Sequence, residues 1–528
     1  MEEQIGTGKS VDSGGATNGK VNDNGLQRGG SLRVTKRRTF TQGKLALFLR
    51  KNYFLVFLSC ATIIVGLSWY RAWYAGTLIV DGFNLNGLSE TLGFICYFVP
   101  FLTYCFTYYL VWNNNGINFK QVKRLAYMLA VIFSFMLPML SNDVFSLITY
   151  GDAANKGLDV YTNTHALFSS VYFPYVSKFW QTAPCVYGPV VLIGARVAAW
   201  FGNGNMMLAL VAYKVIALLW AILFIEIAAQ MTQMFATSPR KLFFILLSPF
   251  FMLQGLAQLH CDGIAATLAL CGVYFVFTQR WYVAFAFGAL CVAVKINYVL
   301  ILPFLLMALY LKTDGWMTFI RRASIALFIY VAAFVLVYSG VYTSPDTFTV
   351  MFRFVFDRAP AKSLAELIGG AIYYVPHVIH GDHQAIQDGL IGKISAEQVT
   401  IWNTVKTVSQ LLAVATSAYI LFKFITGKRE LQQWFRVYVR LLLLFMLVYT
   451  HIFFAWYLIM FIPFMWMVED PEFMQWLFVL SFLVNMQDIV CALSRNSTVY
   501  FFSFALTVLS ILAYVWKFRK VYVKSLGY

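Results

Sequence analysis

The segment LALVAYKVIALLWAILFIEIAA, residues 208–229, decides the fold class of this chain. It contains only one lysine and one glutamate, and a helix needs roughly 20 apolar residues to cross a hydrocarbon layer about 30 Å thick. Further apolar runs occur at 54–70 and 325–338. The sequence therefore predicts an all-α membrane protein that crosses the bilayer many times.

The composition excludes a soluble globular protein. Of the 528 residues, 60% are hydrophobic and 12% are charged, whereas roughly a quarter of the residues in a soluble domain are charged. A soluble chain could not bury so much apolar surface. A lipid bilayer would cover it, so the bilayer is the first expected partner.

The formal net charge of +17 indicates topology and not nucleic-acid binding. Lysine and arginine lie mainly in short segments between the apolar runs, and such segments stay on the cytoplasmic side of a membrane. A basic stretch from Arg33 to Lys51 precedes the first expected span. We therefore expect a cytoplasmic N-terminus, with residues 1–45 forming a disordered basic tail, and a cytoplasmic C-terminus.

Counting spans from the cytoplasmic side predicts about 14 transmembrane helices, within a range of 12–14. They cover about 53–75, 88–112, 125–141, 205–231, 242–259, 263–278, 281–294, 298–311, 323–341, 403–425, 437–453, 454–468, 473–493 and 498–516. Two long polar loops, 142–188 and 342–402, fall on the outer side, and the short apolar segment 188–201 is expected to be an interfacial helix.

Ionisable side chains from distant parts of the chain converge on this predicted outer face. Such groups are costly near hydrocarbon and are therefore candidates for a functional role. They are Asp143, Asp152, His260, Asp262, Lys295, the 353–358 stretch and His451. The alternative is that each one separately marks a helix end at the water interface.

Asp143, in the sequence SNDVF at 141–145, lies where the third expected span leaves the bilayer. A carboxylate that is partly desolvated there has a raised pKa, which suits a general base. The turn PCVYGP at 184–189 and the segment GLDVY at 157–161 follow it.

These motifs resemble the GT-C superfamily of membrane glycosyltransferases, and within it the polyprenyl-phosphate-mannose-dependent α-mannosyltransferases of the lipomannan type. Three later segments extend the resemblance: QGLAQLHCDG at 254–263, AVKINY at 293–298 before LPF, and AWY at 455–457 before IPF. The family has Asn-Pro-Tyr where this chain has DVY at 159–161. The resemblance implies a catalytic transmembrane region at 46–470, followed by C-terminal helices and a basic tail at 471–528.

The resemblance implies an inverting glycosyltransferase, and more specifically a mannosyltransferase. It would move a sugar from a polyprenyl-phosphate donor to a glycan or glycolipid acceptor on the non-cytoplasmic face. Asp143 would remove the proton of the acceptor hydroxyl, and Lys295, His260 and Arg358 would bind the donor phosphate. Asp262, Asp152 and Tyr187 would orient these groups. Trp456, Tyr457 and His451 would contact the sugar or the lipid.

Other interpretations remain open from the sequence. No metal ligand is assigned, because no Asp-x-Asp pair lies nearby; a divalent cation between Asp143 and Asp262 is the alternative. The function alternatives are a transporter or flippase for a lipid-linked sugar and a protein O-glycosyltransferase. A bacterial cell membrane and an endoplasmic reticulum membrane would both suit this sequence.

Overall fold

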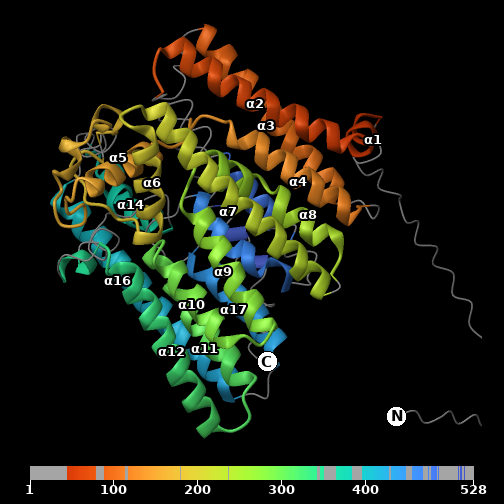
Figure 1. Cartoon of the computed structure of the whole chain (residues 1–528), viewed down its shortest axis with the longest axis vertical. Coiled ribbons are helices and arrows are strands. Elements are labelled where there is room, and N and C mark those ends of the chain that lie inside the picture. Colours follow the sequence, from red (N-terminus) through yellow and green to blue (C-terminus); the bar gives the residue numbers. More distant parts are fainter. Residues whose placement is uncertain are drawn as a thin grey trace, which may run out of the picture.

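The computed structural model describes residues 44–78, 88–112, 117–178, 180–235, 237–341, 345–349, 364–382, 395–426, 430–446 and 455–467, with short pieces between 474 and 517. Within these ranges the chain folds into helices joined by turns, and no β-strand occurs (Figure 1). The all-α fold class is therefore confirmed for the described part of the chain.

The N-terminal helices form one edge of the helical bundle (Figure 1). They are α1 (Lys44–Lys51), α2 (Tyr53–Ala75), α3 (Leu88–Trp112) and α4 (Phe119–Ser134). Helix α2 packs against both α3 and α4. It ends at Gly76, whose φ of 64° is left-handed and whose backbone N–H bonds to the carbonyls of the last turn, a helix ending that glycine adopts without steric cost.

The loop predicted at 142–188 is folded. It contains α5 (Asp143–Asn155), η2 (Ala166–Ser169) and η3 (Phe173–Tyr175), and α6 (Pro189–Gly202) follows it. Helices α5 and α6 lie side by side, and Gly151 permits this because a Cβ there would stand 2.4 Å from the backbone of Ala195.

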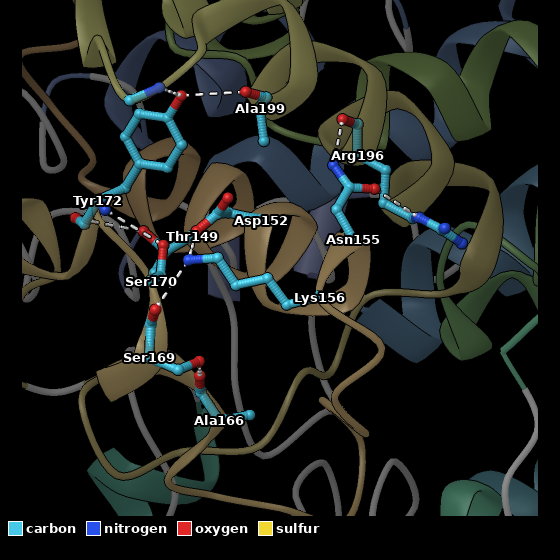
Figure 2. Close-up of polar contacts among 11 residues, drawn as sticks. Thr149, Asp152, Asn155, Lys156, Ala166, Ser169, Ser170, Tyr172, Arg196 and Ala199 are labelled. Carbon is cyan, nitrogen blue, oxygen red and sulfur yellow. Dashed lines mark hydrogen bonds and ion pairs between the residues drawn. The ribbon is translucent and has the colours of Figure 1, made fainter.

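Hydrogen bonds tie the loop to these two helices (Figure 2). The Tyr172 hydroxyl donates to the carbonyl of Ala199, and Lys156 donates to the carbonyl of Ser169. The side chain of Asn155 donates to the carbonyl of Arg196. The loop is therefore held in one arrangement on the α5–α6 pair.

The central part of the bundle is formed by α7 (Met206–Met234), α8 (Pro239–Leu247), η4 (Phe250–Ala257), α9 (Asp262–Phe277) and α10 (Trp281–Val292). The chain continues through η5 (Ile296–Leu300), α11 (Ile301–Leu311) and α12 (Trp316–Tyr338). The later helices are α14 (Leu364–Ile379), α16 (Ala396–Thr426), α17 (Leu431–Leu444) and the 3-10 helix η7 (Ala455–Met467).

Five helices in the described residues are long and apolar enough to cross a membrane: Tyr53–Ala75, Thr91–Trp112, Met206–Met234, Trp316–Tyr338 and Ala396–Phe422. Only 17% of the apolar window of α12 and 11% of that of α16 are buried inside the protein. Apolar surface left open to this extent needs lipid to cover it, so the polytopic membrane architecture stands, while the number of 14 spans stays a prediction.

Several elements differ from the predicted spans. The segment expected at 242–259 is divided into α8 and the π-helix η4, bent by 42°. Pro249 lies at this break, and proline cannot donate the backbone hydrogen bond that a continuous helix requires. Helix α4 ends at Ser134 and not near 141, and α16 begins at Ala396, inside the predicted loop 342–402.

Candidate functional site

The first turn of α5 carries Asp143 into a cluster built from five separate segments. The indole Nε1 of Trp180 donates a hydrogen bond of 2.9 Å to Oδ1 of Asp143. Nδ1 of His260 lies 3.8 Å from Oδ2, and the Asp143 side chain is 28% exposed. The carboxylate is therefore held by Trp180, lies next to His260 and can still be reached by a ligand.

The environment of Asp143 makes its carboxyl group a better proton acceptor. Burial raises its pKa above the ordinary value, although hydrogen bonds from Trp180, Tyr187 and Ser141 and the charge of Lys295 oppose the shift. A carboxylate with a raised pKa matches a general base to a working pH near neutrality. Because the charge of Lys295 lowers the pKa of Asp143, the Lys295 ammonium group lies close enough to act on this carboxyl group electrostatically.

His260 is buried between Asp143 and an aromatic ring of η7. Its imidazole stacks on Trp456, with ring centroids 3.9 Å apart and an angle of 16° between the planes. Burial, together with the charge of Lys295, lowers the pKa of His260 to about 3, so the ring is neutral at pH 7. Its Nε2 atom is buried and has no hydrogen-bond partner among the described residues. A neutral ring could give a donor phosphate a hydrogen bond but not a positive charge.

Lys295 and Asp262 form the ion pair of the cluster. The Lys295 Nζ lies 3.0 Å and 3.2 Å from the two carboxylate oxygens, and the Tyr298 hydroxyl donates to the Asp262 carbonyl at 3.2 Å. The same ammonium lies 4.3 Å from the ring centroid of Tyr457, a cation–π distance. Burial alone would lower the pKa of Lys295, but Asp262 and Tyr457 outweigh it and raise that pKa. Lys295 therefore keeps its positive charge.

Asp262 does not contact His260 through its carboxylate in the described part of the chain. Its carboxylate oxygens are engaged by Lys295 and Tyr298, and its side chain is only 3% exposed. The geometry makes Asp262 a partner of Lys295. The prediction that it orients His260 has no supporting contact.

The segment before α9 is attached directly to the chain that leads into Asp143. Oε1 of Gln258 accepts hydrogen bonds from the backbone N–H groups of Met139 and Leu140, at 3.0 Å and 2.9 Å. Leu259 has a left-handed φ of 62°, an uncommon conformation for a residue with a side chain. The side chain of Lys214 donates to the carbonyl of Ala257 at the end of η4. These contacts fix where the chain turns and thus where His260 lies.

The turn at 184–189 is attached to the segment that carries Lys295. The N–H of Gly188 bonds to the carbonyl of Val294 at 2.9 Å, and the N–H of Val190 bonds to the carbonyl of Ala293 at 3.2 Å. A Cβ on Gly188 would stand 2.0 Å from the Ala293 oxygen. Tyr187 next to it is 8% exposed and belongs to the cluster. Only glycine permits this close approach of two backbones.

One predicted residue lies away from this cluster, and two others fall outside the described residues. Asp152 lies nine residues after Asp143 on α5, roughly 13 Å along the helix axis, and pairs with Lys156 at 2.9 Å (Figure 2). Arg358 and His451 lie outside the described residues, as does the rest of the 353–358 stretch. Their predicted roles stay predictions.

Trp180, Tyr298 and Gln258 belong to the site and were not predicted. Trp180 stands alone in a long loop, and nothing in its spacing relates it to Asp143. Tyr298 and Gln258 lie inside two of the motifs quoted above, three residues after Lys295 and two before His260. That proximity was the available signal for both.

The Asp143 carboxylate is the accessible acid of the cluster, since 28% of its side chain is exposed. Across the residues the structure describes, no group of three or more His, Cys, Asp or Glu is placed to hold a metal ion. Asp143 supplies an accessible base and Lys295 a permanent cation. This pair can accept a proton and stabilise a neighbouring anion in one site.

Comparison with known proteins identifies a related family. Residues 53–311 match the family model of the α-(1→6)-mannopyranosyltransferase N-terminal domain. The chain is also 27% identical over 191 residues to α-(1→6)-mannopyranosyltransferase A of Corynebacterium glutamicum, and this match covers 35% of the chain and 38% of that relative. The resemblance to α-mannosyltransferases of the lipomannan type is therefore confirmed. The family match contains Asp143, His260, Asp262 and Lys295 and ends before η7.

Proposed function

We propose, from the match of residues 53–311 to an α-(1→6)-mannopyranosyltransferase domain, that this membrane protein is a mannosyltransferase. Its donor would be a polyprenyl-phosphate mannose and its acceptor a glycan or glycolipid. The observation that carries the proposal is the accessible Asp143 carboxylate, which feels the charge of the Lys295 ammonium that Asp262 holds in an ion pair. The comparisons favour a transferase over a transporter or flippase, because the matched family is one of sugar-transferring enzymes.

In the proposed reaction Asp143 removes the proton from an acceptor hydroxyl. The hydroxyl oxygen then forms a bond to the anomeric carbon of the mannose, on the face opposite the phosphate, and inverts that centre. The bond between the anomeric carbon and the phosphate oxygen breaks, and the phosphate leaves with the electron pair. The raised pKa of Asp143 supports the first step, since a stronger base accepts the proton more readily.

Lys295 would stabilise the charge that grows on the leaving phosphate. Its ammonium is positioned before the reaction by Asp262 and Tyr457, and a preorganised charge in a dry site stabilises a transition state effectively. The buried Nε2 of His260, which has no partner among the described residues, is available to bond a donor oxygen. Trp456 stacks on the imidazole and would hold it in this position.

The proposal places the active site on the non-cytoplasmic face, as the distribution of basic residues predicts. The lipid chain of the donor would then lie among the helices, with its phosphate at the Lys295 end. Reactivity of single cysteines toward a membrane-impermeant reagent tests this sidedness. A cysteine replacing Asn163, in the loop that follows α5, should react in intact cells and a cysteine replacing Asp314 should not.

The function is tested with purified full-length protein in lipid nanodiscs. Radiolabelled polyprenyl-phosphate mannose and a mannan acceptor should give labelled glycan, and GDP-mannose should not replace the donor. The variant Asp314→Asn, which removes an exposed carboxylate in the turn before α12, is the matched control and should keep full activity. Transfer from GDP-mannose alone would overturn the donor class, and no transfer from either donor would overturn the function.

A further inference from the structure

A second candidate site lies at the far end of the bundle from Asp143. A cavity of about 590 Å³ opens where the turn between α9 and α10 meets the beginning of α12. Its lining is formed by Gln279, Arg280, Trp281, Tyr282, Val283 and Arg322. Helix α9 separates it from the first cluster: the 16 residues from Asp262 to Phe277 span roughly 24 Å. This cavity is therefore distinct from the proposed active site.

The cavity carries positive charge, and none of its described lining residues is acidic. Neither Arg280 nor Arg322 forms an ion pair with any residue that the structure describes. The N-terminus of α10 begins at Trp281, inside the lining, and a helix N-terminus adds partial positive charge. Two guanidinium groups beside a helix N-terminus suit a phosphate, because guanidinium groups hydrogen-bond phosphate oxygens in pairs.

The surface next to the cavity suits acyl chains. Arg322, Ile325, Ile329, Ala332 and Leu336 follow the i, i+3, i+7, i+10, i+14 spacing that places residues along one face of α12. Ile325 is 43% exposed and Leu336 is 75% exposed. The distance from Ile325 to Leu336 is roughly 16 Å along the axis, about half the thickness of a hydrocarbon core. The cationic cavity therefore lies at one end of an apolar stripe, the α12 face from Ile325 to Leu336, whose length matches one leaflet of a bilayer.

We propose that this cavity binds the headgroup of an anionic phospholipid, with Arg280 and Arg322 holding the phosphate and the acyl chains lying along the α12 stripe. Tyr282 and Val283 are 41% and 39% exposed, and they form the part of the rim where headgroup and chains meet. Aromatic side chains commonly take this interfacial position. The inference does not depend on the transferase function, because it uses none of the residues of the Asp143 cluster.

Native mass spectrometry of the full chain, titrated with phosphatidylglycerol or phosphatidylcholine, tests the site. The unmodified protein should retain one phosphatidylglycerol more tightly than phosphatidylcholine. The double variant Arg280→Gln/Arg322→Gln should bind it about thirtyfold more weakly, since each basic residue near an anionic lipid contributes about a factor of five. The control Arg321→Gln removes one charge from the position next to Arg322, outside the cavity, and should bind within a few-fold of the unmodified protein.

A second measurement tests the same site if the double variant does not fold. Phosphatidylglycerol brominated high on its acyl chains should quench the fluorescence of the unmodified protein more than that of Trp281→Phe. Equal retention of the two lipids would overturn the proposal, and so would an equal loss in the Arg321 variant. Displacement of phosphatidylglycerol by millimolar inorganic phosphate would identify a free-anion site and would also overturn it. Equal quenching in the two proteins would contradict the position of the lipid.

Discussion

Lys295 and Asp262 meet inside the protein as a two-oxygen ion pair, with Nζ 3.0 Å and 3.2 Å from the carboxylate oxygens. Asp262 begins α9, and Lys295 lies in the turn after α10. The pair joins the two ends of this helical hairpin. It also keeps a cation within electrostatic reach of Asp143, so structure and proposed chemistry depend on the same contact.

Breaking this pair should destabilise the fold as well as stop the reaction. Lys295→Met leaves the Asp262 carboxylate buried without its partner, a change that typically costs about 3–5 kcal/mol. The double variant Lys295→Met/Asp262→Asn should recover much of that stability and remain inactive. Thermal unfolding in detergent, measured beside mannose transfer, separates the two effects. A stable and active Lys295→Met protein would remove Lys295 from the site.

The acid limb of the pH–rate profile should report Asp143. Because burial raises its pKa, transfer should decline with acidification at a higher pH than an ordinary aspartate, near 3.9, would give. Trp180→Phe removes a hydrogen bond that lowers this pKa, so the limb should move to still higher pH. Rates measured across pH with saturating donor check this, and an unmoved limb in Trp180→Phe would exclude Asp143 as the group observed.

The raised pKa of Asp143 also determines how the stability of the folded protein changes with pH. The folded protein holds the Asp143 proton more tightly than the unfolded chain does, because the folded-state pKa is the raised one. The stability that this proton contributes is present at low pH and is lost as the pH rises through the folded-state pKa. Asp143→Asn, which is neutral at every pH, should therefore gain stability relative to the unmodified protein as the pH rises from 4 to 7. An unchanged difference between the two melting temperatures would contradict the raised pKa.

Gln258 should behave as a positioning residue. Gln258→Leu removes the acceptor of two backbone N–H groups, and leaving such groups buried and unpaired costs about 1–3 kcal/mol each. His260 and Asp143 should then lose their relative positions. This change should lower the maximal rate more than it lowers the affinity for the donor. Gln258→Glu retains an acceptor oxygen and should recover part of the rate. Equal rates for the leucine and glutamate variants would show that the hydrogen bonds do not matter for catalysis.

Gly188 should tolerate no side chain. A Cβ at this position would stand 2.0 Å from the Ala293 oxygen and 2.5 Å from its carbonyl carbon, and both are backbone atoms that cannot turn aside. Gly188→Ala should therefore separate the turn from the Lys295 segment and reduce both stability and transfer. Gly66→Ala in α2, where nothing lies within 4 Å, is the control and should leave both unchanged.

The sequence predicted the main helices where apolar length alone decides them. The spans expected at 53–75 and 88–112 coincide with α2 and α3, and the one expected at 205–231 corresponds closely to α7. Prediction was weaker where local backbone chemistry intervenes. The bend at Pro249 and the early end of α4 depend on proline geometry and on the hydrogen bonds made by Gln258, which hydropathy does not contain.

The site was predictable to the extent that its residues lie in motifs at helix ends. Asp143, His260, Asp262 and Lys295 stand at such positions, and the structure brings them together. The partners that tune them could not be inferred in the same way. Trp180 approaches Asp143 across 37 residues, and the pairing of Asp262 with Lys295 instead of His260 depends on how α9 and α10 pack.

The role of Asp143 as the base is decided by the rate of mannose transfer in Asp143→Asn, with donor binding measured on the same preparation. Asparagine keeps the size and the hydrogen bond from Trp180 but cannot accept the proton. Transfer should fall by about 10²–10⁴-fold, the usual contribution of a general base, while the donor still binds with nearly unchanged affinity. Transfer within a few-fold of the unmodified protein would contradict this role.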